Sequence, residues 1–229
     1  MGGMKIKQNI KVLLLIGLII GSVSLANIAS TDSLDESNYP INIMSEGNEE
    51  VTIKEITREQ YVENLAKNEG ITINEADRQV SERTEKALEE IRKSPEMQGE
   101  NVKAAGNITW RQASWVQSYS KNTALKAEMD ASFEIYTNLS FRQINSCTVG
   151  SSLAAGKYTC SWKQSNSWKT TKYPVSAATV GVTGKFYTKV TQTGTGGVSL
   201  PGFTFSGFSA TTKTYVSNSM TIQKQYRVY

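Results

Sequence analysis

The chain has 229 residues, with 25 Lys plus Arg against 21 Asp plus Glu and no histidine, so its formal net charge is +4. The absence of histidine excludes the Ser-His and Cys-His nucleophile pairs, the commonest general base and every metal site that needs an imidazole ligand. Apolar residues make up 38% of the chain and charged residues 20%, which is typical of a globular protein of one or two domains. We therefore expect no enzyme, no cofactor and no metal.

The first 26 residues have the pattern of a secretory signal peptide. A basic start containing Lys5, Lys7 and Lys11 is followed by an apolar stretch of 14 residues, and small residues at Ser24 and Ala26 complete a cleavage site. Because a membrane-spanning helix needs about 20 apolar residues, we expect cleavage near Ala26 and a secreted protein. An uncleaved N-terminal membrane anchor is the alternative. The lysine-rich start and the high Asn, Ser and Thr content are similar to those of exported proteins of Gram-positive bacteria.

Charge is divided unevenly along the rest of the chain. Residues 31–100 hold 18 acidic and eight basic side chains, a net charge of −10, whereas residues 101–229 hold three acidic and 14 basic ones, a net charge of +11. Such asymmetry indicates partners or self-association. It predicts that the acidic part is a solvated face or docks on the basic part. Export and the acidic segment argue against a nucleic-acid partner.

Residues 51–94 are interpreted as an acidic helical hairpin that follows a disordered acidic lead over residues 27–50. Thr57 with Gln60 and Thr72 with Glu75 have the spacing of capping boxes, which begin helices. Gly70 lies where a left-handed C-cap belongs, and Pro95 ends the second helix. Both apolar stripes are thin, so we expect the hairpin to dock on the other domain or on a partner, or to remain partly mobile.

After a linker at residues 95–106, the period of the apolar residues changes from 3.6 to 2, which indicates β-strands. The clearest alternation covers residues 125–135, where the odd positions are apolar. Further strands are expected at 109–119, 139–149, 157–163, 179–190, 198–205 and 213–228, with turns at 151–156 and 194–197. The prediction is an α+β protein by segregation, with the helical hairpin followed by an all-β antiparallel sandwich or barrel over residues 107–229.

Cys147 and Cys160 are the only cysteines and flank a predicted turn. In an exported chain this pattern predicts a disulfide, which would stabilise the fold by roughly 3 kcal/mol. Two reduced thiols are the alternative. A redox enzyme would need a low-pKa thiolate, usually in a Cys-x-x-Cys motif, and that spacing is absent.

Glu128, Asp130 and Glu134 are the only carboxylates after residue 101. They alternate along one predicted strand, on the polar face that also carries Lys126. The spacing of Glu128 and Asp130 is compatible with a pair of catalytic carboxylates, and calcium binding is a second possibility. Alternation favours a plain exposed face for all three side chains.

Aromatic and lysine side chains are interleaved around residue 165. Exposed aromatic rings beside lysines can bind sugars, acidic polymers or lipid headgroups, although many of the rings must belong to the core. The candidate binding patch consists of Lys157, Trp162, Lys163, Trp168, Lys169 and Lys172.

These features predict a secreted or cell-surface β-rich protein that binds without catalysis. Its expected partner is an anionic cell-wall polymer, a membrane surface or another protein, and the acidic helices are expected to dock on the basic β domain. The alternative is a secreted antimicrobial or toxin-like effector whose acidic helical segment is a pro-segment removed by cleavage between residues 94 and 106.

Overall fold

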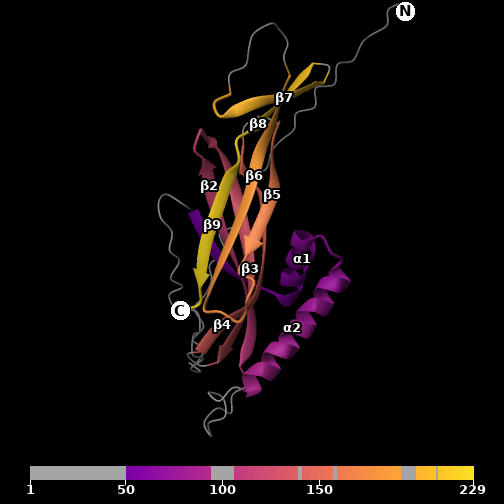
Figure 1. Cartoon of the computed structure of the whole chain (residues 1–229), viewed down its shortest axis with the longest axis vertical. Coiled ribbons are helices and arrows are strands. Elements are labelled where there is room, and N and C mark those ends of the chain that lie inside the picture. Colours follow the sequence, from indigo (N-terminus) through magenta and orange to yellow (C-terminus); the bar gives the residue numbers. More distant parts are fainter. Residues whose placement is uncertain (1–49, 94–105, 139–140, 157–158, 192–199, 210) are drawn as a thin grey trace, which may run out of the picture. The chain divides into compact units, whose positions relative to one another are not determined.

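The structure, a computed structural model, describes residues 50–93, 106–138, 141–156, 159–191, 200–209 and 211–229 (Figure 1). All of them belong to one compact unit that contains two α-helices and two antiparallel β-sheets, with strands predominating. The predicted signal peptide, the acidic lead before residue 50 and most of the predicted linker lie outside the described residues. No helix within the described ranges is long and apolar enough to cross a membrane.

The first sheet has four strands in the order in which they occur in the chain. They are β1 (Glu50–Ile56), β2 (Asn107–Tyr119), β3 (Asn122–Asn138) and β4 (Phe141–Ala155). The second sheet has the order β5-β6-β8-β7, and β9 also pairs with β6. Its strands are β5 (Thr159–Lys169), β6 (Ala177–Thr191), β7 (Phe203–Ser209), β8 (Thr212–Ser217) and β9 (Met220–Arg227). The two sheets are separate and open.

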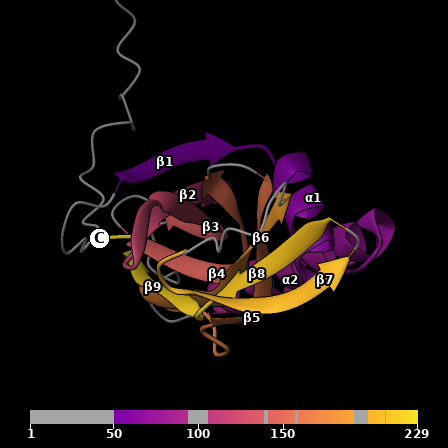
Figure 2. The same cartoon turned by 90° about the horizontal axis from the view of Figure 1, so that it is seen from above.

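The predicted alternation of β3 is confirmed, and it builds the core. The odd-numbered side chains from Leu125 to Ile135 are buried, and they share one apolar cluster with Val180, Val182 and Phe186 of β6 and with Ile222 and Tyr226 of β9. Phe133 stacks on Tyr226, with ring centroids 4.1 Å apart. The two sheets therefore face one another across a common core (Figure 2).

Helix α1 (Arg58–Glu69) begins and ends as its sequence predicts. The Thr57 hydroxyl accepts from the Gln60 backbone N–H, and the Gln60 side chain accepts in turn from the Thr57 N–H, which completes the capping box. Gly70 caps the other end in the left-handed conformation, with φ of 67°. Both ends of the helix are thus encoded locally.

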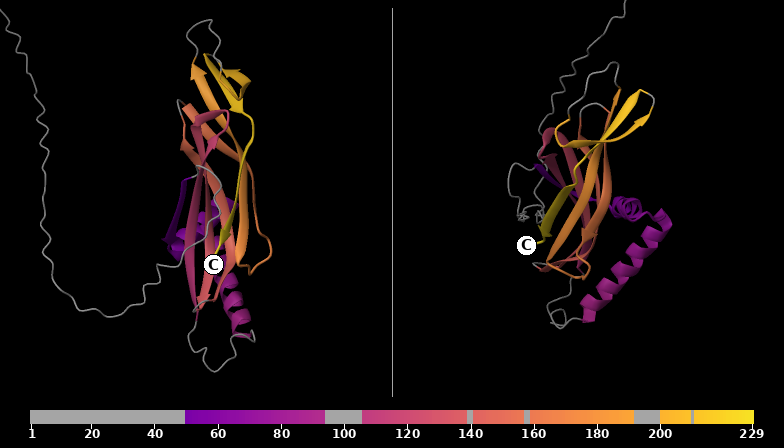
Figure 3. Two further views of the ribbon diagram at one scale, coloured as in Figure 1. Left: turned by 90° about the vertical axis from the view of Figure 1, so that its left-hand side faces the viewer. Right: turned by 45° about the horizontal axis from the view of Figure 1, so that its top comes forward.

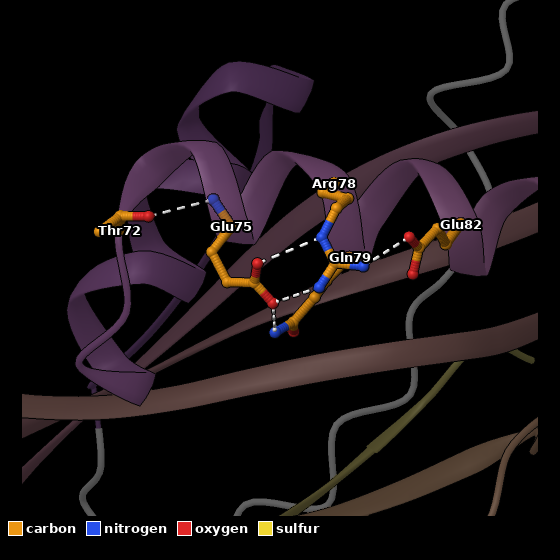
Figure 4. A network of polar contacts seen from close by, with 5 residues as sticks. All are labelled: Thr72, Glu75, Arg78, Gln79 and Glu82. Atoms are coloured by element: carbon orange, nitrogen blue, oxygen red, sulfur yellow. Dashed lines mark hydrogen bonds and ion pairs between the residues drawn. The ribbon is translucent and has the colours of Figure 1, made fainter.

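Helix α2 (Ile73–Lys93) forms only half of its predicted capping box. The Thr72 hydroxyl accepts from the Glu75 N–H at 3.2 Å, but the Glu75 carboxylate accepts from Arg78 and Gln79 instead of turning back to the cap (Figure 4). Arg78 also binds Glu82. The side chains of Arg78 at i+3 and Gln79 at i+4 thus bind the Glu75 carboxylate in place of the Thr72 backbone N–H.

Strand β1 occupies a segment where the sequence indicated the start of the helical hairpin. All seven of its residues pair with β2, from Glu50 opposite Val116 to Ile56 opposite Trp110. The segment is short, and its half-buried residues, Val51 and Ile53, alternate with the exposed polar residues Glu50, Thr52 and Lys54, a composition that also fits an acidic helix. The pairing partner lies more than 50 residues away in the sequence, so local pattern alone does not reveal it.

Two further strand boundaries also differ from expectation. Strand β4 continues through the predicted turn at residues 151–156 as far as Ala155, because it stays paired with β3. The single strand predicted over residues 213–228 is two strands, β8 and β9, which pair with different halves of β6 and change over at Asn218 and Ser219.

The helices lie beside the strands in Figure 1 and contact the first sheet. The sheet residues that they contact, Trp110 and Ser132, belong to the face that points away from the core. Tyr61, Val62 and Leu65 of α1 form a second apolar cluster with Ile56 and Trp110. The Asn64 amide donates to the Ser132 hydroxyl of β3 at 2.9 Å. The even-numbered side chains of β3, which alternation assigns to solvent, are therefore covered where the helices lie.

Candidate functional site

The structure separates the two tryptophans of the predicted patch. A β-bulge between Gln164 and Asn166 shifts the register of β5. Even-numbered residues before the bulge therefore point to one face of the sheet, and even-numbered residues after it point to the other. Trp162 lies opposite Phe186 on the core face, with ring centroids 4.9 Å apart. Trp168 lies opposite Gly181 on the outer face and covers it so closely that a Cβ there would be 2.2 Å from the indole.

The lysines of the predicted patch are also distributed among different environments. Lys163 is exposed on the outer face of the second sheet, and its Nζ lies 4.8 Å from the centroid of the Tyr187 ring. Lys169 binds Glu69 of α1 at 2.5 Å. Lys172 is exposed in the segment after β5, and Lys157 lies outside the described residues. Of the six residues, Lys163 contacts Tyr187, which lines an open groove on the second sheet.

An open groove of about 490 Å³ lies where β8 ends and β9 begins. At this point Lys185 and Phe186 of β6 pair with neither strand, although the Phe186 N–H donates to the Ser217 hydroxyl at 2.9 Å. The groove is lined by Lys185, Tyr187, Thr204, Phe205, Ser206, Val216, Ser217, Asn218 and Ser219. An ammonium group, aromatic rings, hydroxyls and an amide thus converge on one open site.

The charged side chains described at this groove, Lys163 and Lys185, are both cations. Lys163 and Lys185 are directly opposite one another in the β5–β6 pair, a placement of like charges that destabilises a sheet. Residues 135–229 contain ten Lys plus Arg and no Asp or Glu. No carboxylate side chain of the second sheet is therefore present to neutralise the two ammonium groups. An anionic ligand would relieve their repulsion.

No family model, curated protein or solved structure matches the chain significantly. An assignment of function then depends on the groove, its charges and the other polar groups of the fold. Within the described ranges no cluster of three or more Cys, Asp or Glu could hold a metal ion.

A second unusual feature is the buried carboxyl group of Glu134. Sequence alternation placed this side chain on an exposed face, and that prediction is wrong because the helices cover it completely. Neither of its oxygens accepts a hydrogen bond from the described residues. Burial raises the pKa of Glu134, and the nearby Arg83 guanidinium opposes this shift. Thr84 and Asn145 also lower the pKa, although neither reaches hydrogen-bonding geometry.

Burial of Glu134 makes the stability of the helix–sheet contact depend on pH. The pKa of Glu134 in the folded chain is raised above the ordinary value of 4.5 because burial favours the neutral carboxyl group. The resulting stabilisation of the fold is fully present below pH 4.5 and is lost as the pH rises through the raised pKa. Glu134→Gln resembles the protonated form. Thermal unfolding is expected to show a higher Tm for this variant than for wild type at pH 7, and the difference is expected to shrink toward pH 4.5. A lower Tm for the variant at pH 7 would mean that the attraction to Arg83 outweighs burial.

The other two carboxylates of β3 remain partly accessible. Asp130 accepts from the Gln112 amide at 3.0 Å and from the Ser114 hydroxyl. Burial and the neighbouring Asp130 raise the pKa of Glu128. Lys54 of β1 opposes that shift. Both carboxylates lie on the first sheet, away from the groove.

The predicted disulfide is not present, and Cys147 and Cys160 are both free. Cys147 is buried in the middle of β4, opposite Phe133, and its Sγ lies 3.0 Å from the Tyr173 hydroxyl. Cys160 lies beside Gly156, beyond the far end of β4. Because β4 continues as a strand to Ala155, the two cysteines are roughly 25 Å apart by the strand rise, whereas a disulfide needs Cα atoms within about 7 Å.

Proposed function

We propose that this chain is a secreted or cell-surface binding protein, not an enzyme, and that the groove between β8 and β9 binds an anionic surface polymer. The observation that carries the proposal is the pair Lys163 and Lys185, which lie opposite one another on a sheet without acidic side chains. Repulsion between them is a cost that the free protein bears and that a bound anion removes.

The chemistry of the groove supports a polymer with charged and hydroxyl-bearing units. An ammonium group donates up to three hydrogen bonds to phosphate or carboxylate oxygens. Tyr187 offers a ring face and a hydroxyl, and Ser206, Asn218 and Ser219 supply further polar groups. The groove is open to solvent, so one unit of a larger polymer can enter it.

The architecture that we propose for this function is α+β by segregation, with the two helices as one hairpin and the two sheets as an antiparallel sandwich. Support comes from the contact of α1 with α2, which includes the ion pair of Arg58 and Asp77 at 2.6 Å, and from the core that the sheets share. In this arrangement the helices occupy the outer face of the first sheet, α1 reaches the second sheet through the ion pair of Glu69 and Lys169, and Lys163 is exposed to a ligand.

Secretion is part of the proposal and is supported by the basic, apolar and small-residue pattern of residues 1–26. An exported protein of this kind meets anionic polymers at the cell surface. The acidic residues before β1 and the basic second sheet then belong to one secreted molecule.

Binding is tested with poly(glycerol phosphate), which carries phosphate and hydroxyl groups, on a titration calorimeter or an affinity column. We expect affinity that decreases steeply as salt rises from about 0.1 M to about 1 M, because screening shortens the Debye length from about 10 Å to about 3 Å. The double variant Lys163→Gln/Lys185→Gln is expected to bind about tenfold more weakly, since surface charge contacts contribute up to about 1 kcal/mol each.

The matched control is Lys54→Gln/Lys67→Gln, which removes two exposed lysines from β1 and α1 and changes the net charge equally. Its affinity should equal that of wild type. Equal losses in both double variants would show attraction to the net charge alone, and binding that is insensitive to salt would contradict the proposal.

A further inference from the structure

Strand β7 carries a row of phenylalanines that begins beside the core and ends in solvent. Phe203, Phe205 and Phe208 lie opposite Ser217, Tyr215 and Lys213 of β8. Tyr215 in turn lies opposite Thr188 of β6, which is on the core face with Phe186. Directly opposite residues of an antiparallel pair share a face. The bulge between Phe205 and Gly207 places Phe208 on the same face as Phe203 and Phe205. All three rings are therefore on the core side of the second sheet.

The exposure of these rings increases along β7 because the first sheet ends before the second does. Phe203 packs edge-on against Tyr119, the last residue of β2, with ring centroids 6.2 Å apart. Beyond that contact, Phe205 is 54% exposed and Phe208 63% exposed. Figure 3 shows the β7–β8 hairpin extending past the end of the first sheet. The apolar face of the hairpin is therefore exposed to solvent beyond the end of the first sheet.

The charges around the exposed rings are positive. Lys213 lies opposite Phe208 on the same face. Lys121, in the turn after β2, is next to the base of the hairpin, since a Cβ at Gly202 would be 2.4 Å from the Lys121 Cβ. No acidic residue occurs after Glu134 in the sequence. Exposed aromatic rings beside lysines are suited to the headgroup region of an anionic membrane.

We propose that the β7–β8 hairpin binds a bilayer that contains anionic lipid, with Phe205 and Phe208 at the boundary between headgroups and acyl chains and Lys213 and Lys121 beside the headgroups. A second copy of the chain is a weaker occupant, because a symmetric contact through this face would bring the lysines of both copies together. Phe205 also lines the groove, whereas Phe208, Lys213 and Lys121 do not, so substitution of Phe208 tests this inference separately from polymer binding.

The test is co-sedimentation of the full chain with vesicles of phosphatidylglycerol and phosphatidylcholine in equal parts, and with vesicles of phosphatidylcholine alone. We expect binding to the first and little to the second. Phe208→Ser, which changes an exposed ring outside the groove lining, should reduce partitioning by about tenfold or more. Phe141→Ser is the matched control, because Phe141 is 43% exposed and begins β4, outside the hairpin.

A Phe208→Ser variant that still binds poly(glycerol phosphate) like wild type and loses the vesicles supports the inference. Equal vesicle binding by Phe208→Ser and wild type would overturn it, since attraction would then be electrostatic alone. Failure of the wild type to bind anionic vesicles would also overturn it. So would a dimer in sedimentation velocity that Phe208→Ser dissociates, because the face would then be occupied by a second copy.

Discussion

A chain that begins at residue 101 is expected to lose cooperative unfolding or to melt at least about 10 °C below the full chain. Such a chain lacks β1 and both helices, so β2 becomes a bare edge strand with unpaired backbone groups, which promotes aggregation. Trp110 loses the cover of Ile56 and α1, and Ser132 loses its hydrogen bond to Asn64. Hydration of Glu134 offsets part of this loss of stability. Each large apolar side chain that is no longer buried nevertheless costs about 1.5–3 kcal/mol, which is large beside a total free energy of unfolding of about 5–15 kcal/mol.

The control for this truncation is a chain that begins at residue 48, which keeps β1, α1 and α2. Its thermal unfolding should match that of the chain from residue 27 on. Cooperative unfolding of the 101–229 chain near the wild-type Tm would contradict the expectation. That result would instead favour the effector alternative, in which the sheets must remain folded after the acidic segment is removed by cleavage.

Phe133→Ala is expected to lower the free energy of unfolding by about 3–5 kcal/mol, the usual cost of removing a large buried ring. Phe133 is fully buried and joins the two sheets through its stacked contact with Tyr226, with an interplanar angle of 14°. A protein of this size loses about 2–4 °C of Tm per kcal/mol, so the Tm should decrease by about 10 °C. Chemical denaturation measures the free energy directly.

Phe208→Ala is the matched control for the core substitution. It removes the same atoms from a ring that is mostly exposed, and surface substitutions of this kind usually change stability by no more than about 0.5 kcal/mol. A cost for Phe133→Ala below about 1 kcal/mol would mean that the two sheets do not share the core described above.

Local signals in the sequence predicted the elements that depend on neighbouring residues. The capping box of Thr57 and Gln60 and the left-handed Gly70 need only a few adjacent residues, and the alternation of β3 needs only its own strand. These features are encoded within one element, which is why composition and periodicity suffice to identify them.

Features that depend on distant partners were missed or misplaced. β1 exists because β2 accepts it, and Glu134 is buried because a separate pair of helices covers an otherwise polar face. The spacing of Cys147 and Cys160 suggested a turn, whereas a long strand separates them. A single bulge sends Trp162 and Trp168 to opposite faces, and no pattern in β5 indicates it.

The candidate groove was only partly accessible to sequence reasoning. The sequence shows that residues 135–229 contain no acidic side chain, and the predicted binding patch includes Lys163. Lys185 and the lining residues of β8 were not identified, because the groove exists only where β8 gives way to β9 beside β6. That position depends on strand order, which alternation does not reveal.

The most direct test of the proposed binding site is a lysine-labelling footprint on the full chain. The protein is acetylated under limiting reagent with and without saturating poly(glycerol phosphate), and each lysine is quantified by mass spectrometry. We predict strong protection of Lys163 and Lys185 and unchanged labelling of the exposed Lys54 and Lys67. Unchanged labelling of Lys163 and Lys185 with the polymer bound, or equal protection of all four lysines, would contradict a site at the groove.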